Sequence, residues 1–277
     1  MQETEFSGII HIIDARIINM NKLIETCSMT AFKAILYGLV TVIFLFSISG
    51  CTGNDNSGFT ESQGRVISFS GLDWRVKSSG ENRVGPGPNY FSDSEDNVMV
   101  DEQGRLHLKI TFRDGRWYCS GIETVKSYGH DKYVFYISSR PDSLDKQVVW
   151  GLYTYSNDQE EIDIEFSRWG IDRNQEAQYV VQPSKPGNRV RFRMNLEGSY
   201  TTHIIDWKRK RIDFASYHGH RLRPERETDE IAQWSYTGKD VPPDNDERLK
   251  INLWLFRGAA PSDNREAEVV INRVEIR

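Results

Sequence analysis

The sequence predicts an all-β protein built from two packed antiparallel sheets. Two observations indicate this class: after residue 65, apolar residues recur with a period of two, and clusters of turn-forming residues separate these stretches. No segment sustains the 3.6-residue period that is typical of an amphipathic helix. Without helices to cover a parallel sheet, we expect antiparallel strands in two sheets that pack face to face.

The expected strands are short runs in which apolar and polar residues alternate. Turn clusters at residues 101–104, 114–115 and 183–188 lie between some of them. Successive side chains of a strand point to opposite faces, so each strand can bury one face and expose the other. The runs that we expect to form strands are 105–110, 132–137, 148–155, 160–166, 189–194, 249–256 and 267–271.

Length and composition favour one large folded domain. The chain has 277 residues, of which 12% are aromatic, and no change of composition after residue 65 indicates a second domain. The net charge is -5 with both signs interspersed, so we expect no nucleic-acid partner. Only Cys119 of the three cysteines lies after residue 65, so we expect a domain that its core stabilises without a disulfide. We also expect the protein to be a monomer.

The N-terminal region has the layout of a secretory signal peptide. Lys33 precedes an uncharged stretch, residues 34–54, whose centre at 35–46 is apolar. The stretch includes Ile48-Ser49-Gly50-Cys51, which resembles the lipobox of bacterial lipoproteins, where the cysteine is lipidated and becomes the mature N-terminus. An uncleaved membrane anchor is the alternative, although the apolar run is shorter than the roughly 20 residues that span a bilayer.

The lipoprotein interpretation divides the chain into three parts. Residues 1–50 are an N-terminal extension and signal peptide, residues 51–64 are the lipidated Cys51 with a small and polar linker, and residues 65–277 are the folded domain. We expect translation to start at Met29 or, as the alternative, at Met20. The expected location is the cell envelope, with the lipid on Cys51 as the contact with the membrane.

The strand at residues 160–166 contains the candidate catalytic groups. Alternation places Glu161, Asp163 and Glu165 on one face and apolar side chains on the other. Three like charges on one face repel one another, so solubility alone does not explain them. A retaining glycosidase uses two carboxyl groups about 5 to 5.5 Å apart, one as the nucleophile and one as the acid. Glutamates about 13 Å apart at their backbones can close most of that distance, and Asp163 between them can hydrogen-bond one and raise the proton affinity of the other.

This spacing of Glu, any residue, Asp, any residue and Glu resembles the active-site strand of glycoside hydrolase family 16, the group of laminarinases, lichenases and xyloglucan endotransglycosylases. Residues 118–129, 202–207 and 251–254 resemble other segments of the family in the same order, so the resemblance covers residues 65–277. It implies a concanavalin-like jelly roll. It also implies that Glu161 is the nucleophile, Glu165 the general acid/base and Asp163 the assisting carboxylate.

The activity implied by the resemblance is retaining, endo-acting hydrolysis of a β-linked polysaccharide of β-glucan or algal galactan type. Asp158-Gln159 stand where lichenase-like members usually have an aromatic residue, which leaves the polysaccharide open. Sugar-binding candidates follow from alternation and from their place near the catalytic strand, because aromatic rings stack on sugars and amides bind hydroxyl groups. These candidates are Trp169, Gln178, Gln182, Asn252 and Trp254.

Two alternatives to a hydrolase remain open. A transglycosylase uses the same residues, and a non-catalytic carbohydrate-binding lipoprotein can share the same fold. The intact acidic triad favours the enzyme, because a binding protein has no need of both glutamates. No cysteine or histidine spacing indicates a metal site; the resemblance requires no cofactor and allows a structural calcium ion.

Overall fold

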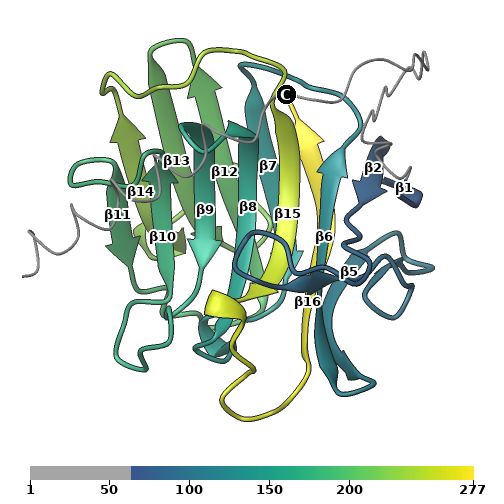
Figure 1. The fold of residues 1–277 in the computed structure, drawn as a ribbon. Helices are drawn as coiled ribbons and strands as arrows, with labels where there is room; N and C mark the ends of the chain where they lie inside the picture. Colours follow the sequence, from purple (N-terminus) through teal and green to yellow (C-terminus); the bar gives the residue numbers. More distant parts are fainter. Residues whose placement is uncertain (1–63) are drawn as a thin grey trace, which may run out of the picture. The chain divides into compact units, whose positions relative to one another are not determined.

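The computed structural model describes residues 64–277, which form two layers of β-strands (Figure 1). The predicted signal peptide, Cys51 and nearly all of the predicted linker lie outside the described residues, so they stay predictions. No helix in the described range is long and apolar enough to cross a membrane.

The front layer, which we call the front sheet, holds the strand with the candidate catalytic residues. Its neighbours pair antiparallel throughout. In spatial order the strands are β11 (Arg189–Phe192), β10 (Ala177–Val181), β9 (Glu160–Phe166), β8 (Val148–Asn157), β15 (Arg248–Leu255), β6 (Arg116–Thr124), β2 (Leu72–Val76) and β1 (Val66–Phe69).

The back sheet lies behind it and is joined to it by the β5–β6 hairpin. A short β3 (Tyr90–Phe91) pairs parallel with β6. The three short 3₁₀ turns within residues 64–277 are Pro141–Ser143, Glu227–Asp229 and Phe256–Gly258. The strands of the back sheet are β4 (Val98–Val100), β5 (Leu106–Arg113), β16 (Ala267–Ile276), β7 (Lys132–Ser138), β12 (Tyr200–Lys208), β13 (Arg211–His218) and β14 (Glu230–Tyr236). The all-β, antiparallel prediction is therefore confirmed.

The hydrophobic core fills the space between the two sheets. Ile162, Ile164 and Phe166, the apolar half of β9, are fully buried in it. The Phe166 ring lies edge-on to the His203 ring of β12, with centroids 4.8 Å apart, whereas the Tyr179 ring of β10 stacks on the Phe214 ring of β13 at 4.9 Å. Because the inner face of β9 is occupied by this packing, its acidic half must point away from the core.

Candidate active site

Strand β9 presents Glu161, Asp163 and Glu165 on the outer face of the front sheet, as alternation predicts. The two glutamates are half-buried, whereas Asp163 between them is only 3% exposed. Asp163 and Glu161 are hydrogen-bonded to each other through their side chains. A hydrogen bond between two carboxyl groups forms when one of them carries a proton.

Burial shifts the proton affinity of all three groups upward. It raises the pKa of Glu161 to about 7. The hydrogen bond with Asp163 opposes this rise, and the charge of Glu165 adds to it. Burial, with the charges of both glutamates, holds the pKa of Asp163 well above its ordinary value. Since Asp163 is the most deeply buried, it keeps its proton most strongly and donates it to Glu161, which favours the ionised form of Glu161.

Glu165 has different partners. Burial raises its pKa to about 6, while the hydrogen bond from Gln178 and the charge of Arg191 oppose the rise. Gln178 Nε2 donates to Glu165 Oε2 at 2.7 Å, and Arg191 Nε donates to Gln178 Oε1 at 3.0 Å. The two outer carboxyl groups therefore lie in different surroundings, and both titrate near neutral pH, with the pKa of Glu161 above that of Glu165.

The two predicted glutamines both contact the triad. Gln178 binds Glu165, and Gln182 Nε2 donates to Asp163 Oδ2 at 3.2 Å. Both lie on the β10 side of β9, where Gln178 pairs directly with Glu165. In this structure they position the carboxyl groups, and binding of sugar hydroxyls by them remains a prediction.

Asn252 and Trp254 also lie on the outer face, although neither contacts the triad directly. Cross-strand pairing aligns Asn252 with Gly151 and Gly151 with Glu165, so Asn252 is two strands away from Glu165. The Asn252 amide is buried and donates to the hydroxyl of Tyr153. Asn252 is thus part of the floor of this face.

Trp169 follows β9 in a loop and packs beside Trp254. Their ring centroids are 6.2 Å apart, and the Phe256 ring lies 5.5 Å from that of Trp169. The three aromatic side chains form a group at one end of the outer face. The structure thus brings together two residues that were selected separately from the sequence.

Three residues near the triad were not selected from the sequence. Tyr153 of β8 pairs with Asp163 of β9, and Tyr155 pairs with Glu161. Arg191 of β11 pairs with Gln178, which itself pairs with Glu165. Alternation within 148–155 and 189–194 already placed each of them on one face of its strand. Which face, and which neighbour, depends on the pairing register, which a single strand does not reveal.

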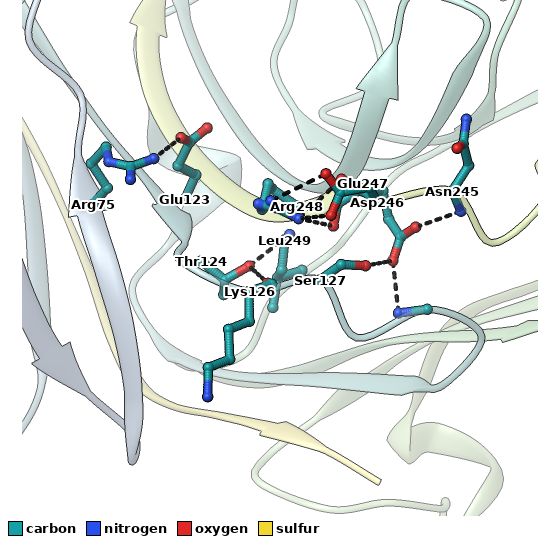
Figure 2. A network of polar contacts seen from close by, with 11 residues as sticks. Arg75, Glu123, Thr124, Lys126, Ser127, Asn245, Asp246, Glu247, Arg248 and Leu249 are labelled. Atoms are coloured by element: carbon teal, nitrogen blue, oxygen red, sulfur yellow. Dashed lines mark hydrogen bonds and ion pairs between the residues drawn. The ribbon is translucent and has the colours of Figure 1, made fainter. Parts of the chain in front are cut away.

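The end of the outer face opposite Arg191 is held by ion pairs and a buried glutamate. Glu123 of β6 lies 3.3 Å from Arg75 and 3.0 Å from Lys250 of β15. Glu247, just before β15, is 3% exposed and accepts hydrogen bonds from a backbone N–H and from Ser127 Oγ, the latter at 2.8 Å (Figure 2). These contacts fix the start of β15 against the loop after β6.

A metal site is not evident in the described residues. Within residues 64–277, no group of three or more His, Cys, Asp or Glu side chains is arranged to hold an ion. The structural calcium ion that the resemblance allows stays a prediction.

The structure resembles solved structures of glucanases. A Bacillus licheniformis β-glucanase is 19% identical with a TM-score of 0.55, over 76% of this chain and 94% of that one. A β-1,3-glucanase from Mycobacterium marinum is 16% identical with a TM-score of 0.54, over 74% and 90%. A protein of Mycobacterium tuberculosis described as a pseudo β-1,3-glucanase is also 16% identical, with a TM-score of 0.52 over 73% and 90%. At these identities the likeness shows the jelly-roll fold.

The comparison with curated proteins found no match. The comparison with protein families matched residues 88–272 to the model described as glycosyl hydrolases family 16. This range contains the whole acidic strand, both glutamines that bind it and the aromatic group. Since it spans well over half of the 277 residues, the chain belongs to glycosyl hydrolase family 16.

Proposed function

We propose that this protein is a retaining, endo-acting hydrolase of a β-linked polysaccharide, of β-glucan or galactan type. The observation that supports it most is the arrangement on β9, in which two half-buried glutamates flank a buried Asp163 that hydrogen-bonds Glu161. Neither the fold nor solubility requires three adjacent carboxyl groups on one face, whereas double displacement requires two of them.

In the first step, Glu165 donates its proton to the glycosidic oxygen while the Glu161 carboxylate forms a bond to the anomeric carbon. The bond between that carbon and the leaving oxygen breaks, and the leaving sugar departs. In the second step, Glu165 takes a proton from water as the water oxygen attacks the same carbon and releases Glu161. Asp163 supports the ionised form of Glu161 in both steps, and its hydrogen bond with Gln182 holds it in place.

The floor beside Glu165 supports a polymeric substrate. Gly151 of β8 lies next to Glu165, and a Cβ atom at this glycine would meet only the ring edge of Tyr153 at 3.4 Å. No side chain of β8 therefore stands over the strand at this point. We infer that the polysaccharide passes across the strands here, which is consistent with cleavage inside a chain.

A reducing-end assay with a panel of β-linked polysaccharides tests this proposal. We expect the wild type to generate new ends on at least one of them and Glu161→Gln to generate none. Nuclear magnetic resonance of the first product should show the β-anomer, because two displacements restore the starting configuration. An α-anomer as the first product would exclude retention, and no product on the whole panel would exclude hydrolysis.

A non-catalytic carbohydrate-binding protein is the second candidate. It is favoured by the Mycobacterium tuberculosis relative, whose description as a pseudo β-1,3-glucanase shows that this fold also occurs without the expected activity. In that case Glu161→Gln would bind polysaccharide as the wild type does, and neither would generate reducing ends. A transglycosylase would instead lengthen labelled acceptor sugars at the expense of the polymer.

We also propose that the protein is a lipoprotein of the cell envelope. The support is the sequence Ile48-Ser49-Gly50-Cys51 after an apolar run. A polysaccharide is too large to enter the cytoplasm intact, so attachment through Cys51 would place the domain where it meets its substrate.

A further inference from the structure

A hollow of about 470 Å³ lies beside the triad, at the end of the outer face where Arg191 stands. Its walls come from the loop after β9 and from the turn after β15, with Trp169 and Phe256 as the aromatic components. Arg191 connects the hollow to the triad, because it donates to Gln178, which in turn donates to Glu165. A sugar unit in the hollow would therefore be close to the general acid/base.

The hollow is strongly cationic. Arg191 and Arg257 both line it, and its lining contains no acidic residue. Within residues 64–277 neither arginine forms an ion pair, although other arginines nearby do: Arg193 of the same strand lies 2.7 Å from Glu176. The carboxylate of the adjacent loop, Asp172, is paired with a lysine at 2.8 Å. Two guanidinium groups thus line one space without an ion-pair partner among the described residues, although the Glu165 carboxyl group is near enough for its charge to interact with that of Arg191.

The remaining walls suit a sugar ring. The Trp169 and Phe256 rings stand at 85° to each other, and the Arg257 guanidinium lies 5.0 Å above the Phe256 ring. Gln147 Oε1 is buried near Gly170 and has no hydrogen-bond partner among the described residues. Buried acceptors of this kind are normally satisfied, so it is available to a ligand hydroxyl.

Two residues that line the hollow have a strained backbone conformation. Trp169 has φ 51° and Arg257 has φ 55°, in the left-handed region that non-glycine residues rarely adopt. Strained residues of this kind gather at binding and catalytic sites, where the surrounding structure holds them in place. Both strained positions present their side chains to the same hollow.

We propose that this hollow binds an anionic group of the polysaccharide, a carboxylate or a sulfate ester on a sugar unit next to the cleaved bond, so that the substrate is an acidic polysaccharide. The proposal rests on the proposed function and specifies its substrate class. Arg191 and Arg257 would bind the anion with charge-assisted hydrogen bonds. Trp169 would stack on the sugar ring, and Gln147 would accept from one of its hydroxyl groups.

The test compares polysaccharides that differ only in charge, using the purified full chain. One pair is lichenan and the same glucan after oxidation of its primary hydroxyls to carboxylates. The other is a sulfated galactan before and after chemical desulfation. The values of kcat/KM are measured for the wild type, for Arg257→Gln and for Arg209→Gln, a matched control in the exposed β12–β13 turn.

We expect the wild type to prefer the charged member of at least one pair, and the pair in which it does so distinguishes a carboxylate from a sulfate. Arg257→Gln should reduce that preference about tenfold or more, which corresponds to the loss of one hydrogen bond to a charged group. Arg209→Gln should retain it. A wild type that prefers the neutral member of both pairs would overturn the proposal, as would an unchanged preference in Arg257→Gln.

Binding separates this proposal from the proposed function. Electrophoresis through gels that contain each polysaccharide measures retardation without any need for hydrolysis. If the wild type cleaves nothing but the charged polymers retard it more than Arg257→Gln, the hydrolase proposal fails and the anion site stands. If the wild type cleaves neutral and charged members equally, and Arg257→Gln does so too, the hydrolase stands and the anion site is refuted.

Discussion

Replacing Glu161 by glutamine should stabilise the fold at alkaline pH while it abolishes catalysis. Burial raises the pKa of Glu161 from its ordinary 4.5 to about 7. Between these values the unfolded chain is ionised at this position and the folded protein keeps the proton. The folded state then binds more protons, so the free energy of unfolding falls as the pH rises, by up to about 1.4 kcal/mol per pH unit, until the folded group ionises too.

The difference between the pKa of Glu161 in the folded protein and in the unfolded chain corresponds to about 3 kcal/mol in the free energy of unfolding. Because Glu161 is only half-buried, we expect about 2 kcal/mol of it to be realised. Glutamine has nearly the same shape, keeps an acceptor for Asp163 and has no charge to desolvate. Glu161→Gln should therefore match the wild type near pH 4 and exceed it at pH 8, with a Tm roughly 4 to 8 °C higher for a domain of this size.

Thermal unfolding from pH 4 to pH 8 measures this difference. Glu123→Gln is the control: burial raises the pKa of Glu123, but its ion pairs with Lys250 and Arg75 outweigh burial and lower the pKa overall. Its carboxylate therefore stabilises the fold above the unfolded pKa, and Glu123→Gln should lose stability as the pH rises. If the curves of Glu161→Gln and the wild type stay parallel over the whole range, the buried position of Glu161 does not raise its pKa and the reasoning is wrong.

Four further predictions concern the roles of individual residues. Glu165→Ala should lose most activity on the polysaccharide but keep some on an aryl glycoside, whose leaving group needs no protonation, and azide should restore turnover with a β-glycosyl azide as the product. Azide could rescue Glu161→Ala only with inversion of configuration. If the product spectra show exchanged rescue patterns, the roles of the two residues are reversed. The pH profile of kcat/KM should be bell-shaped with limbs at about 6 and about 7; because the pKa of the nucleophile Glu161 (about 7) lies above that of the acid Glu165 (about 6), the active form, with Glu161 ionised and Glu165 protonated, is a minor species that is most populated between these values. Arg191→Gln removes a charge that lowers the pKa of Glu165, so this profile should move to higher pH, and an unmoved profile would contradict the contact. Cys51→Ser should leave the membrane fraction or stall in processing; normal processing with continued sedimentation would argue against the lipid anchor.

Much of the fold was predictable because strand formation is a local property here. The alternation in residues 160–166 gave the bounds of β9 and its acidic face, and the run at 148–155 begins where β8 begins. The turn residues at 114–115 lie in the hairpin between β5 and β6. In each case neighbouring residues in the chain contain the whole signal.

The sequence by itself therefore determined the all-β class, the acidic strand and the face on which Glu161, Asp163 and Glu165 lie, because a strand of period two sorts its own side chains. Only the tertiary structure decided which side chains stand beside them. The pairing register of β10 and β11 brings Gln178 and Arg191 to Glu165, and two separate loops bring Trp169 and Arg257 to one hollow. Such neighbours are set by sheet packing and loop paths, which involve contacts between residues far apart in the chain and leave no periodic pattern in it.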